Sequence, residues 1–428
     1  MKQTYIFTVI LGLMLVMTNC MDAKNNKANV AGVKPDADNA ELKLPDGFSA
    51  LKVADNVGRA RHIAVTQNGE VYVKLNRTVD GKGILLLADT NGDGRADEQS
   101  GFGDYGGTGI HLNDDYLYAS SNSTVYRYKL DDKQHVLNPD QPQVVVSGLI
   151  DRRQHNSKSF TLDDDGYIYV NIGAYSNACQ ERDRTKGSPG IDPCPILEQA
   201  GGIWRFKADG LDQSCEDGIR FATGLRNVVG LDWNRQDNQL YVMMHGRDQL
   251  HDLFPDLYTT QESADLPSEA MYALKEGDNC GWPYMYYDQI QHKKILAPEY
   301  GGDGKKEYDG PAIDPALAFP GHLAPNALLF YTGNMFPEKY KNGAFVAFHG
   351  SWNRAPELQE GFYVVFAPFK DGKPTGEWEI FADNFAGMEN VVSPGDAVHR
   401  PCGLAQGPDG SLYVSDDAHG TIYRILYK

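Results

Sequence analysis

Residues 165–170 read Asp-Gly-Tyr-Ile-Tyr-Val, a short phrase whose recurrence along the chain indicates the fold class. A turn residue pair followed by alternating apolar residues predicts a tight turn and a period-2 β-strand. Similar phrases recur along the chain, centred on Tyr72, Tyr118, Tyr169, Tyr241, Phe345 and Tyr413. The first three aromatic residues are 46 and 51 residues apart, close to the roughly 40–50 residues of a four-stranded propeller blade. Six copies therefore predict an all-β chain, a six-bladed β-propeller with long inserted loops where the later copies are further apart.

Composition limits the classes of function. The 428 residues contain 40 Lys and Arg against 58 Asp and Glu, a formal charge of −18. Such a chain has little positive charge with which to neutralise phosphates, which argues against a nucleic acid or an anionic membrane surface as partner. A hydrophobic content of 41% is enough for a packed core and excludes disorder for most of the chain.

The N-terminus has the pattern of an export signal. Lys2 precedes an apolar run at residues 5–17, which predicts a signal peptide over residues 1–20. The run ends at Cys20, where lipidation and ordinary cleavage nearby both remain open. Residues 21–43 are polar and predict a flexible tether, followed by a propeller domain over residues 44–428. We therefore expect a protein without a transmembrane span that is exported, either periplasmic or lipid-anchored to the bacterial envelope.

Export permits disulfide bonds. Cys179 and Cys194 flank a polar loop that contains prolines, and they form the best candidate pair among the six cysteines.

Several loops next to predicted strands contain residues suited to chemistry. In propellers such loops converge at one end of the axis and form the ligand site. His155 lies at the start of a strand and is a candidate general base, with an ordinary surface histidine as the alternative. Arg226 and Asn227 could stabilise a developing negative charge. Arg354 and Arg400 supply local positive charge for an anionic ligand, or form surface ion pairs instead.

Two further segments have oxygen donors arranged for a cation. Asp89, Asn91, Asp93 and Asp97, with a glycine at the sixth position, match the first part of a calcium loop. Ser100 occupies the twelfth position in place of glutamate, so a structural calcium site completed elsewhere and a hairpin turn remain equal alternatives. In the second segment, Asp278 precedes Gly281-Trp282-Pro283, whose carbonyls could face a calcium ion or simply form a tight turn.

The order of these segments resembles the soluble quinoprotein glucose and sorbosone dehydrogenases, and the later segments resemble the sorbosone-like branch. The segments that carry the resemblance are residues 154–157, 224–227, 281–283, 348–354, 400–401 and 407–417. The resemblance spans residues 44–427 and implies a propeller that binds pyrroloquinoline quinone (PQQ) and Ca²⁺. It implies oxidation of an aldose or related sugar at C1, with electrons passed to an external acceptor, a quinone or a cytochrome.

The resemblance also implies roles for individual residues. His155 would remove the proton of the substrate's C1 hydroxyl, and Arg226 and Asn227 would hydrogen-bond the quinone oxygen. Main-chain oxygens of Gly281 and Pro283, with Asp278 nearby, would hold the calcium. The remaining cofactor contacts would come from His322, His349, Arg354 and Arg400. Two other functions stay open: a calcium-dependent lactonase-like propeller, and a non-catalytic carbohydrate-binding propeller.

Overall fold

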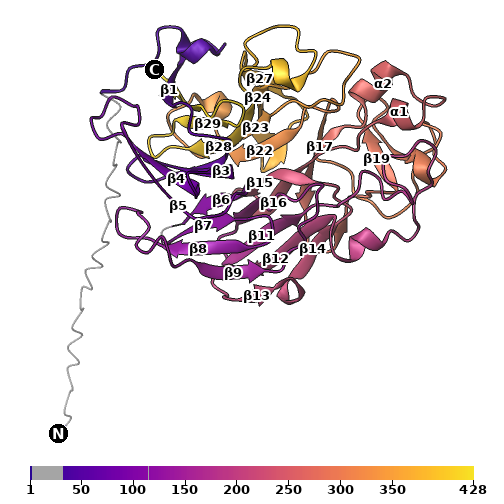
Figure 1. The fold of residues 1–428 in the computed structure, drawn as a ribbon, viewed down its shortest axis with the longest axis horizontal. Helices are drawn as coiled ribbons and strands as arrows, with labels where there is room; N and C mark the ends of the chain where they lie inside the picture. Colours follow the sequence, from indigo (N-terminus) through magenta and orange to yellow (C-terminus); the bar gives the residue numbers. More distant parts are fainter. Residues whose placement is uncertain (2–31, 114) are drawn as a thin grey trace.

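Six antiparallel sheets surround a central axis in the computed structural model, which describes residues 1, 32–113 and 115–428 (Figure 1). The inner strands are β2 (Ala60–Val65), β6 (Ile110–Leu112), β10 (Phe160–Leu162), β15 (Val228–Asn234), β22 (Pro325–Phe330) and β28 (Pro401–Gln406). Each inner strand lies beside that of the next blade, and β28 lies beside β2, which closes the ring. Residues of all six strands line an axial cavity of about 190 Å³. The predicted six-bladed β-propeller is confirmed.

Three further strands complete each blade. Blades 1 to 3 continue through β3 (Val71–Val79), β4 (Lys82–Ala88) and β5 (Glu98–Phe102); β7 (Tyr116–Ser120), β8 (Val125–Lys129) and β9 (Gln143–Ser147); and β11 (Tyr167–Ile172), β12 (Gly202–Lys207) and β14 (Ile219–Thr223). Blades 4 to 6 continue through β16 (Gln239–Met244), β17 (Glu269–Leu274) and β21 (Leu317–Phe319); β23 (Ala344–Phe348), β24 (Tyr363–Ala367) and β27 (Glu379–Ala382); and β29 (Leu412–Asp416), β30 (Ile422–Tyr427) and β1 (Phe48–Ala54). The ring is therefore closed by pairing of the first strand with the last.

The recurrent aromatic residue has the same place in every blade. Each of the six lies in the second strand and is at most 2% exposed. Tyr72 packs against residues of blade 2, Tyr118 against blade 3, and Tyr169 against blade 4. The other three extend this series around the ring, so that Tyr413 packs between blades 6 and 1. The aromatic repeat thus fills the space between neighbouring blades, where a large apolar side chain removes the most surface from water.

Insertions account for the wider spacing of the later copies. Between β16 and β17 lie two short helices, α1 (Leu250–Leu253) and α2 (Thr260–Asp265). Other additions are the strands β13 (Gln213–Ser214) and β18 (Asp278–Asn279), and the hairpins β19 (Met285–Asp288) with β20 (Lys293–Leu296) and β25 (Phe369–Lys370) with β26 (Lys373–Pro374). Single 3₁₀ turns are η2 (Asn39–Glu41), η3 (Pro195–Glu198), η4 (Cys215–Asp217), η5 (Pro298–Tyr300), η6 (Glu338–Tyr340) and η7 (Pro394–Asp396).

The loop between β11 and β12 contains the predicted disulfide. Cys179 and Cys194 are bonded, with an S–S distance of 2.04 Å, so this prediction is confirmed. The bond closes a loop of blade 3 that extends over the same end of the axis as His155.

The end of the predicted tether packs against the propeller. The predicted signal peptide, Cys20 and the first part of the tether lie among residues 2–31, outside the described residues. Further on, Ala40 and Leu42 are buried in the core shared by blades 5 and 6, and Lys43 forms an isolated β-bridge with Asp383. Within the described part of the chain, no helix combines the length and the apolar character needed to span a membrane.

Candidate functional site

One end of the axis gathers the predicted functional loops, and we call it the mouth. His155 lies before β10, Arg226 and Asn227 directly before β15, and Arg400 directly before β28. Inner strands of neighbouring blades start at the same end of a propeller, so their preceding loops meet there. The loops between the second and third strands of each blade also open at the mouth, because the second strand runs antiparallel to the first and ends where the first begins.

His155 has a fixed ring orientation. Its backbone has φ +50°, and its Nδ1 lies 2.5 Å from the carbonyl oxygen of Ala174. Since a carbonyl can only accept, Nδ1 carries the hydrogen and Nε2 presents its lone pair. Burial, together with the positive charge of Arg226, lowers the pKa of His155 to about 3. The imidazole is therefore neutral near pH 7, with Nε2 available to take a proton.

Close backbone packing brings His155 and Asn227 together. Both residues adjoin Gly173, where a Cβ would lie 2.5 Å from the carbonyl oxygen of His155 and 3.0 Å from Oδ1 of Asn227. Only glycine permits this approach. Asn227 is 7% exposed, and its Oδ1 has no hydrogen-bond partner among the described residues. A buried amide oxygen without a partner is costly, which marks a position where a bound molecule would restore the lost hydrogen bonding.

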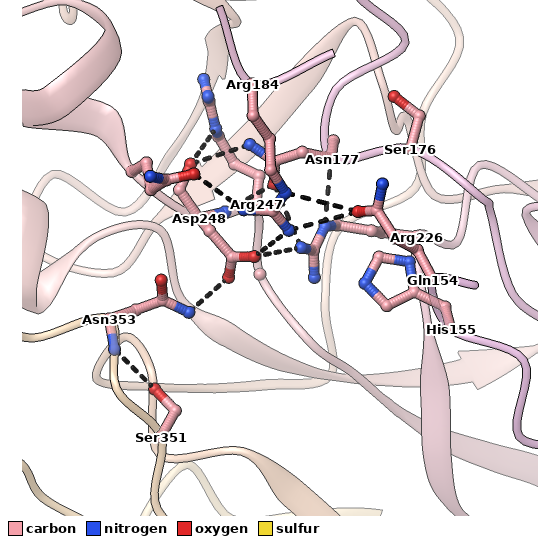
Figure 2. A network of polar contacts seen from close by, with 12 residues as sticks. Gln154, His155, Ser176, Asn177, Arg184, Arg226, Arg247, Asp248, Ser351 and Asn353 are labelled. Atoms are coloured by element: carbon pink, nitrogen blue, oxygen red, sulfur yellow. Dashed lines mark hydrogen bonds and ion pairs between the residues drawn. The ribbon is translucent and has the colours of Figure 1, made fainter. Parts of the chain in front are cut away.

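Arg226 belongs to a buried network centred on Asp248 (Figure 2). Oδ2 of Asp248 accepts from Nη2 of Arg226 and from Nη2 of Arg184, each at 2.6 Å. Oδ1 accepts from Nδ2 of Asn353, also at 2.6 Å. Although burial alone would raise the pKa of Asp248, the charges of Arg226 and Arg184 hold it well below its ordinary value. Asn177 adds contacts to Arg226 through its backbone carbonyl and its Oδ1.

This network connects the arginine to the histidine. Arg184 belongs to the disulfide-closed loop, and its Nε and Nη2 lie 3.3 Å from Oε1 of Gln154, the neighbour of His155 in the chain. Figure 2 shows the imidazole of His155 beside the guanidinium of Arg226. The loops of blades 3, 4 and 5 thus hold one another in place around His155.

Several arginine side chains gather at the mouth of this acidic protein. Arg226 and Arg184 share a single carboxylate. Nε and Nη2 of Arg400 donate to the carbonyls of His349 and Gly350, and no described carboxylate forms an ion pair with it. His349 bonds to Asp417, which also pairs with Arg61. Two arginines on one carboxylate, and an Arg400 whose donors meet only carbonyls, could bind an anionic ligand.

Arg354 and His322, two residues predicted to contact the cofactor, form hydrogen bonds with other parts of the protein. Every N–H of the Arg354 guanidinium has a protein partner: carbonyls of Leu358, Ala264 and Gly321, and the carboxylates of Asp265 and Glu360. His322 is 2% exposed, and its Nε2 contacts the carbonyls of Ser263 and Leu266. Both side chains tie α2 to the propeller. The hydrogen bonding of Arg354 does not fit a contact with a cofactor, and the cofactor contact of His322 stays a prediction.

The predicted calcium donors of the Gly-Trp-Pro segment are used within the fold. The carbonyl of Gly281 accepts from the amides of Tyr284 and Met285, and Oδ2 of Asp278 accepts from the amide of Lys275. Pro283 follows Trp282 through a cis peptide bond. Since the lone pairs of Gly281 are already used by a turn, these residues do not form a calcium ligand set in this structure. The segment instead contacts the mouth network, because Nε1 of Trp282 donates to the carbonyl of Asn177 at 3.0 Å.

The other predicted calcium loop joins β4 to β5. Asp89 accepts from the amides of Gly92 and Gly94, and Asp97 accepts from Thr90 and Asn91. Asn91 and Asp93 likewise accept from loop amides. These contacts form a hairpin turn, the second of the two alternatives. Across residues 32–113 and 115–428, no group of three or more His, Cys, Asp or Glu is arranged to hold a metal ion.

The sequence reasoning missed several members of the site. Asp248, Arg184, Asn177 and Arg247 were not predicted, although all contribute to the network. Arg247 pairs with Glu299 at 2.9 Å, with both side chains at most 4% exposed. A charged Arg-Asp pair directly after the buried end of β16 was an available signal, since buried charges need partners.

Comparisons with known proteins agree with this arrangement. The model of the TrAA12-like family matches residues 42–294 and 297–428. A pyrroloquinoline quinone-dependent pyranose dehydrogenase of Coprinopsis cinerea is 28% identical over 285 residues, covering 56% of this chain and 36% of that protein. Alignments with the first curated relatives cover 48% of one and 36% of another, so this chain spans about half of their length or less.

Two solved structures share the fold. The holo form of the PQQ domain of the Coprinopsis cinerea pyranose dehydrogenase has a TM-score of 0.69 and 20% identity, covering 92% of this chain and 98% of that one. A calcium structure of a Trichoderma reesei family AA12 carbohydrate-active enzyme has a TM-score of 0.72 and 18% identity, covering 90% and 97%.

Proposed function

The chain belongs to the TrAA12-like family, and from that premise we propose that it oxidises a sugar at C1 with pyrroloquinoline quinone as cofactor. The expected relationship to PQQ-dependent sugar dehydrogenases is confirmed by the comparisons, while the sorbosone-like branch stays a prediction. The observation that carries the proposal is a neutral His155 with a free Nε2, placed beside Arg226 at a mouth where several arginines gather.

The residues at the mouth fit a flat tricarboxylate. The charge shared by Arg184 and Arg226 and the charge of Arg400 would meet its carboxylates. Nδ2 of Asn227 would donate to a quinone oxygen, and its unpartnered Oδ1 would accept from a donor such as a hydroxyl of the sugar. His349, held by Asp417, would line the same site. When bound, the quinone supplies an acceptor for the hydride of the sugar C1.

The protein's own part of the reaction is proton transfer and charge stabilisation. Nε2 of His155 would take the proton of the C1 hydroxyl, and the hydrogen bond from Nδ1 to Ala174 would keep Nε2 aimed at it. Arg226, held by Asp248 and Asn177, would stabilise negative charge that develops nearby.

We include calcium in the proposal because a solved structure with the same fold, of a Trichoderma reesei family AA12 enzyme, is a calcium structure. Because Asp278, Gly281 and Pro283 do not form its ligand set here, we derive no step from it. Export to the envelope and an external electron acceptor also belong to the proposal, and the Cys179–Cys194 disulfide supports an oxidising location.

The test uses the purified protein with added quinone, with and without Ca²⁺ or a chelator. We expect a shift of the quinone spectrum on binding and aldose-dependent reduction of a dye. His155→Asn should lower kcat/KM for the aldose by about 10²–10⁴-fold, as expected for loss of a general base, while quinone binding persists.

His135→Asn is the matched control, because His135 is a partly exposed histidine paired with Glu70 at the opposite end of the propeller. Sugar-dependent dye reduction without quinone, or a His155→Asn enzyme as fast as the control, would refute the proposal. The lactonase alternative would appear as lactone hydrolysis that needs Ca²⁺ and no quinone.

A further inference from the structure

Two loops at the mouth expose a group of apolar side chains. Trp352 and Leu358, between β23 and β24, are 51% and 46% exposed. Met388, Val392 and Val398, between β27 and β28, are 44%, 65% and 38% exposed. We call these five residues the mouth patch. Single exposed apolar residues are ordinary, but a group on adjoining loops marks an interaction surface.

The two loops pack together as one surface. The amide of Gln359 donates to the carbonyl of Val391 in the other loop at 2.8 Å, and the hydrogen bond from the amide of Val398 to the carbonyl of Ala386 at 3.0 Å holds the β27–β28 loop itself together. Beneath them, Phe362, Ala386, Val391 and Ala397 form a small buried cluster. A surface supported by its own core presents its apolar groups in a fixed arrangement, which lowers the entropy lost when a partner binds.

The mouth patch borders the candidate site. Asn353, the neighbour of Trp352, donates to Asp248 at 2.6 Å. Arg400, two residues after Val398, donates to the carbonyl of Gly350 in the other loop. The same two loops therefore hold the site on one side and expose the patch on the other, so a molecule bound to the patch would lie close to the site.

Acidic residues surround the patch. Glu360, Glu389 and Asp396 are exposed on these loops. The two loops, residues 349–362 and 383–400, contain two arginines: Arg354 is buried and paired with Asp265 and Glu360, and Arg400 donates to carbonyls at the site. An apolar centre with a negatively charged rim is complementary to a protein surface with an apolar centre and a positively charged rim.

We propose that the mouth patch docks a small, basic, single-electron carrier protein. This inference rests on the proposed function, because oxidation of a sugar at C1 to a lactone releases two electrons and two protons. Each carrier would accept one electron, so two carriers would dock in succession for each sugar, and the protons would pass to solvent. Rapid exchange requires a small interface steered by charge, as the patch and its rim provide.

A saccharide chain is the competing occupant. Sugars bind proteins through aromatic faces and polar side chains, whereas four of the five patch residues are aliphatic. The composition therefore favours a protein partner.

The test measures two rates of the quinone-loaded enzyme with an aldose: reduction of a small dye, and reduction of cytochrome c, a basic one-electron carrier. The variants are Leu358→Ser with Val392→Ser, and Glu389→Lys with Asp396→Lys. Leu137→Ser is the matched control, because Leu137 is 53% exposed in the β8–β9 loop at the opposite end of the propeller.

We expect both patch variants to lower kcat/KM for cytochrome c by about ten-fold, equivalent to about 1.4 kcal/mol, with the dye rate and the control unchanged. The wild-type rate with cytochrome c should also fall with salt, and the charge-reversed variant should lose that dependence.

Equal rates of cytochrome c reduction in all variants would overturn this inference and leave the proposed function intact. The same holds if the wild type reduces the dye but does not reduce cytochrome c. If the patch variants lose dye reduction with oligosaccharides but keep it with the simple aldose, the docking proposal is overturned and the patch binds a saccharide chain instead. Absence of dye reduction in the wild type would overturn the proposed function, and this inference with it.

Discussion

Replacement of Asp248 by Asn tests the central charge network. The substitution keeps the shape of the side chain but removes the negative charge shared by two arginines. The side chain of Arg226 is 4% exposed and cannot turn to solvent, whereas that of Arg184 is 27% exposed and can. Removing one partner of a buried ion pair lowers stability by about 3–5 kcal/mol. Loss of the ion pair with the more exposed Arg184 lowers it by at most about 1 kcal/mol more.

We therefore expect Asp248→Asn to lower the free energy of unfolding by about 3 kcal/mol, at the lower end of the range for a buried pair. The measurement is urea-induced unfolding followed by tryptophan fluorescence, with the disulfide intact. The change equals the slope m multiplied by the shift in midpoint, provided that m is the same in both proteins.

The same measurement has a control and a pH dependence. Asp164→Asn breaks the ion pair between two side chains that are 56% and 54% exposed, those of Asp164 and Arg235, and should lower stability by less than about 1 kcal/mol.

The folded-state pKa of Asp248 lies below its unfolded value, so its contribution to stability is present above about pH 4 and is lost as pH falls through the folded pKa. The difference between wild type and Asp248→Asn should therefore shrink in acid.

A loss below about 1 kcal/mol at pH 7 would refute the reasoning, since it would mean that Arg226 does not depend on Asp248 for its charge balance. A double variant, Asp248→Asn with Arg226→Met, should lose less stability than the sum of the single changes, because no buried charge is left unpaired.

Two further predictions concern single groups at the mouth. Arg400→Gln should weaken quinone binding by about ten-fold or more, since a hydrogen bond to a charged group contributes about 1.5–3 kcal/mol; an absorption titration measures this, and an affinity equal to that of Arg235→Gln would contradict it. Burial raises the pKa of Glu269 to about 8, so the unfolded chain loses its proton at lower pH than the folded protein. The wild type should therefore become less stable between about pH 5 and 8 relative to Glu269→Gln, and urea midpoints that change in parallel for both proteins would contradict this.

Local patterns in the sequence determined the blades. A turn followed by alternating residues depends on neighbours within a few positions, so the six copies, their aromatic centres and the ring of blades were predictable. The Cys179–Cys194 pair was predictable for the same reason, since both cysteines flank one short loop. The approach of His155, Arg226 and Arg400 to one mouth followed from the propeller, because their loops all precede inner strands.

Only the tertiary structure decided which charges have partners. Arg184 and Asp248 are 64 residues apart, and no spacing rule connects them. The sequence alone predicted Arg354 and Arg400 equally as cofactor contacts. In the structure, every donor of Arg354 is used by α2 and its neighbours, whereas Arg400 donates only to carbonyls. Periodicity reports which residues face the core, but the neutralisation of a buried charge depends on side chains that the folded chain brings together from different blades.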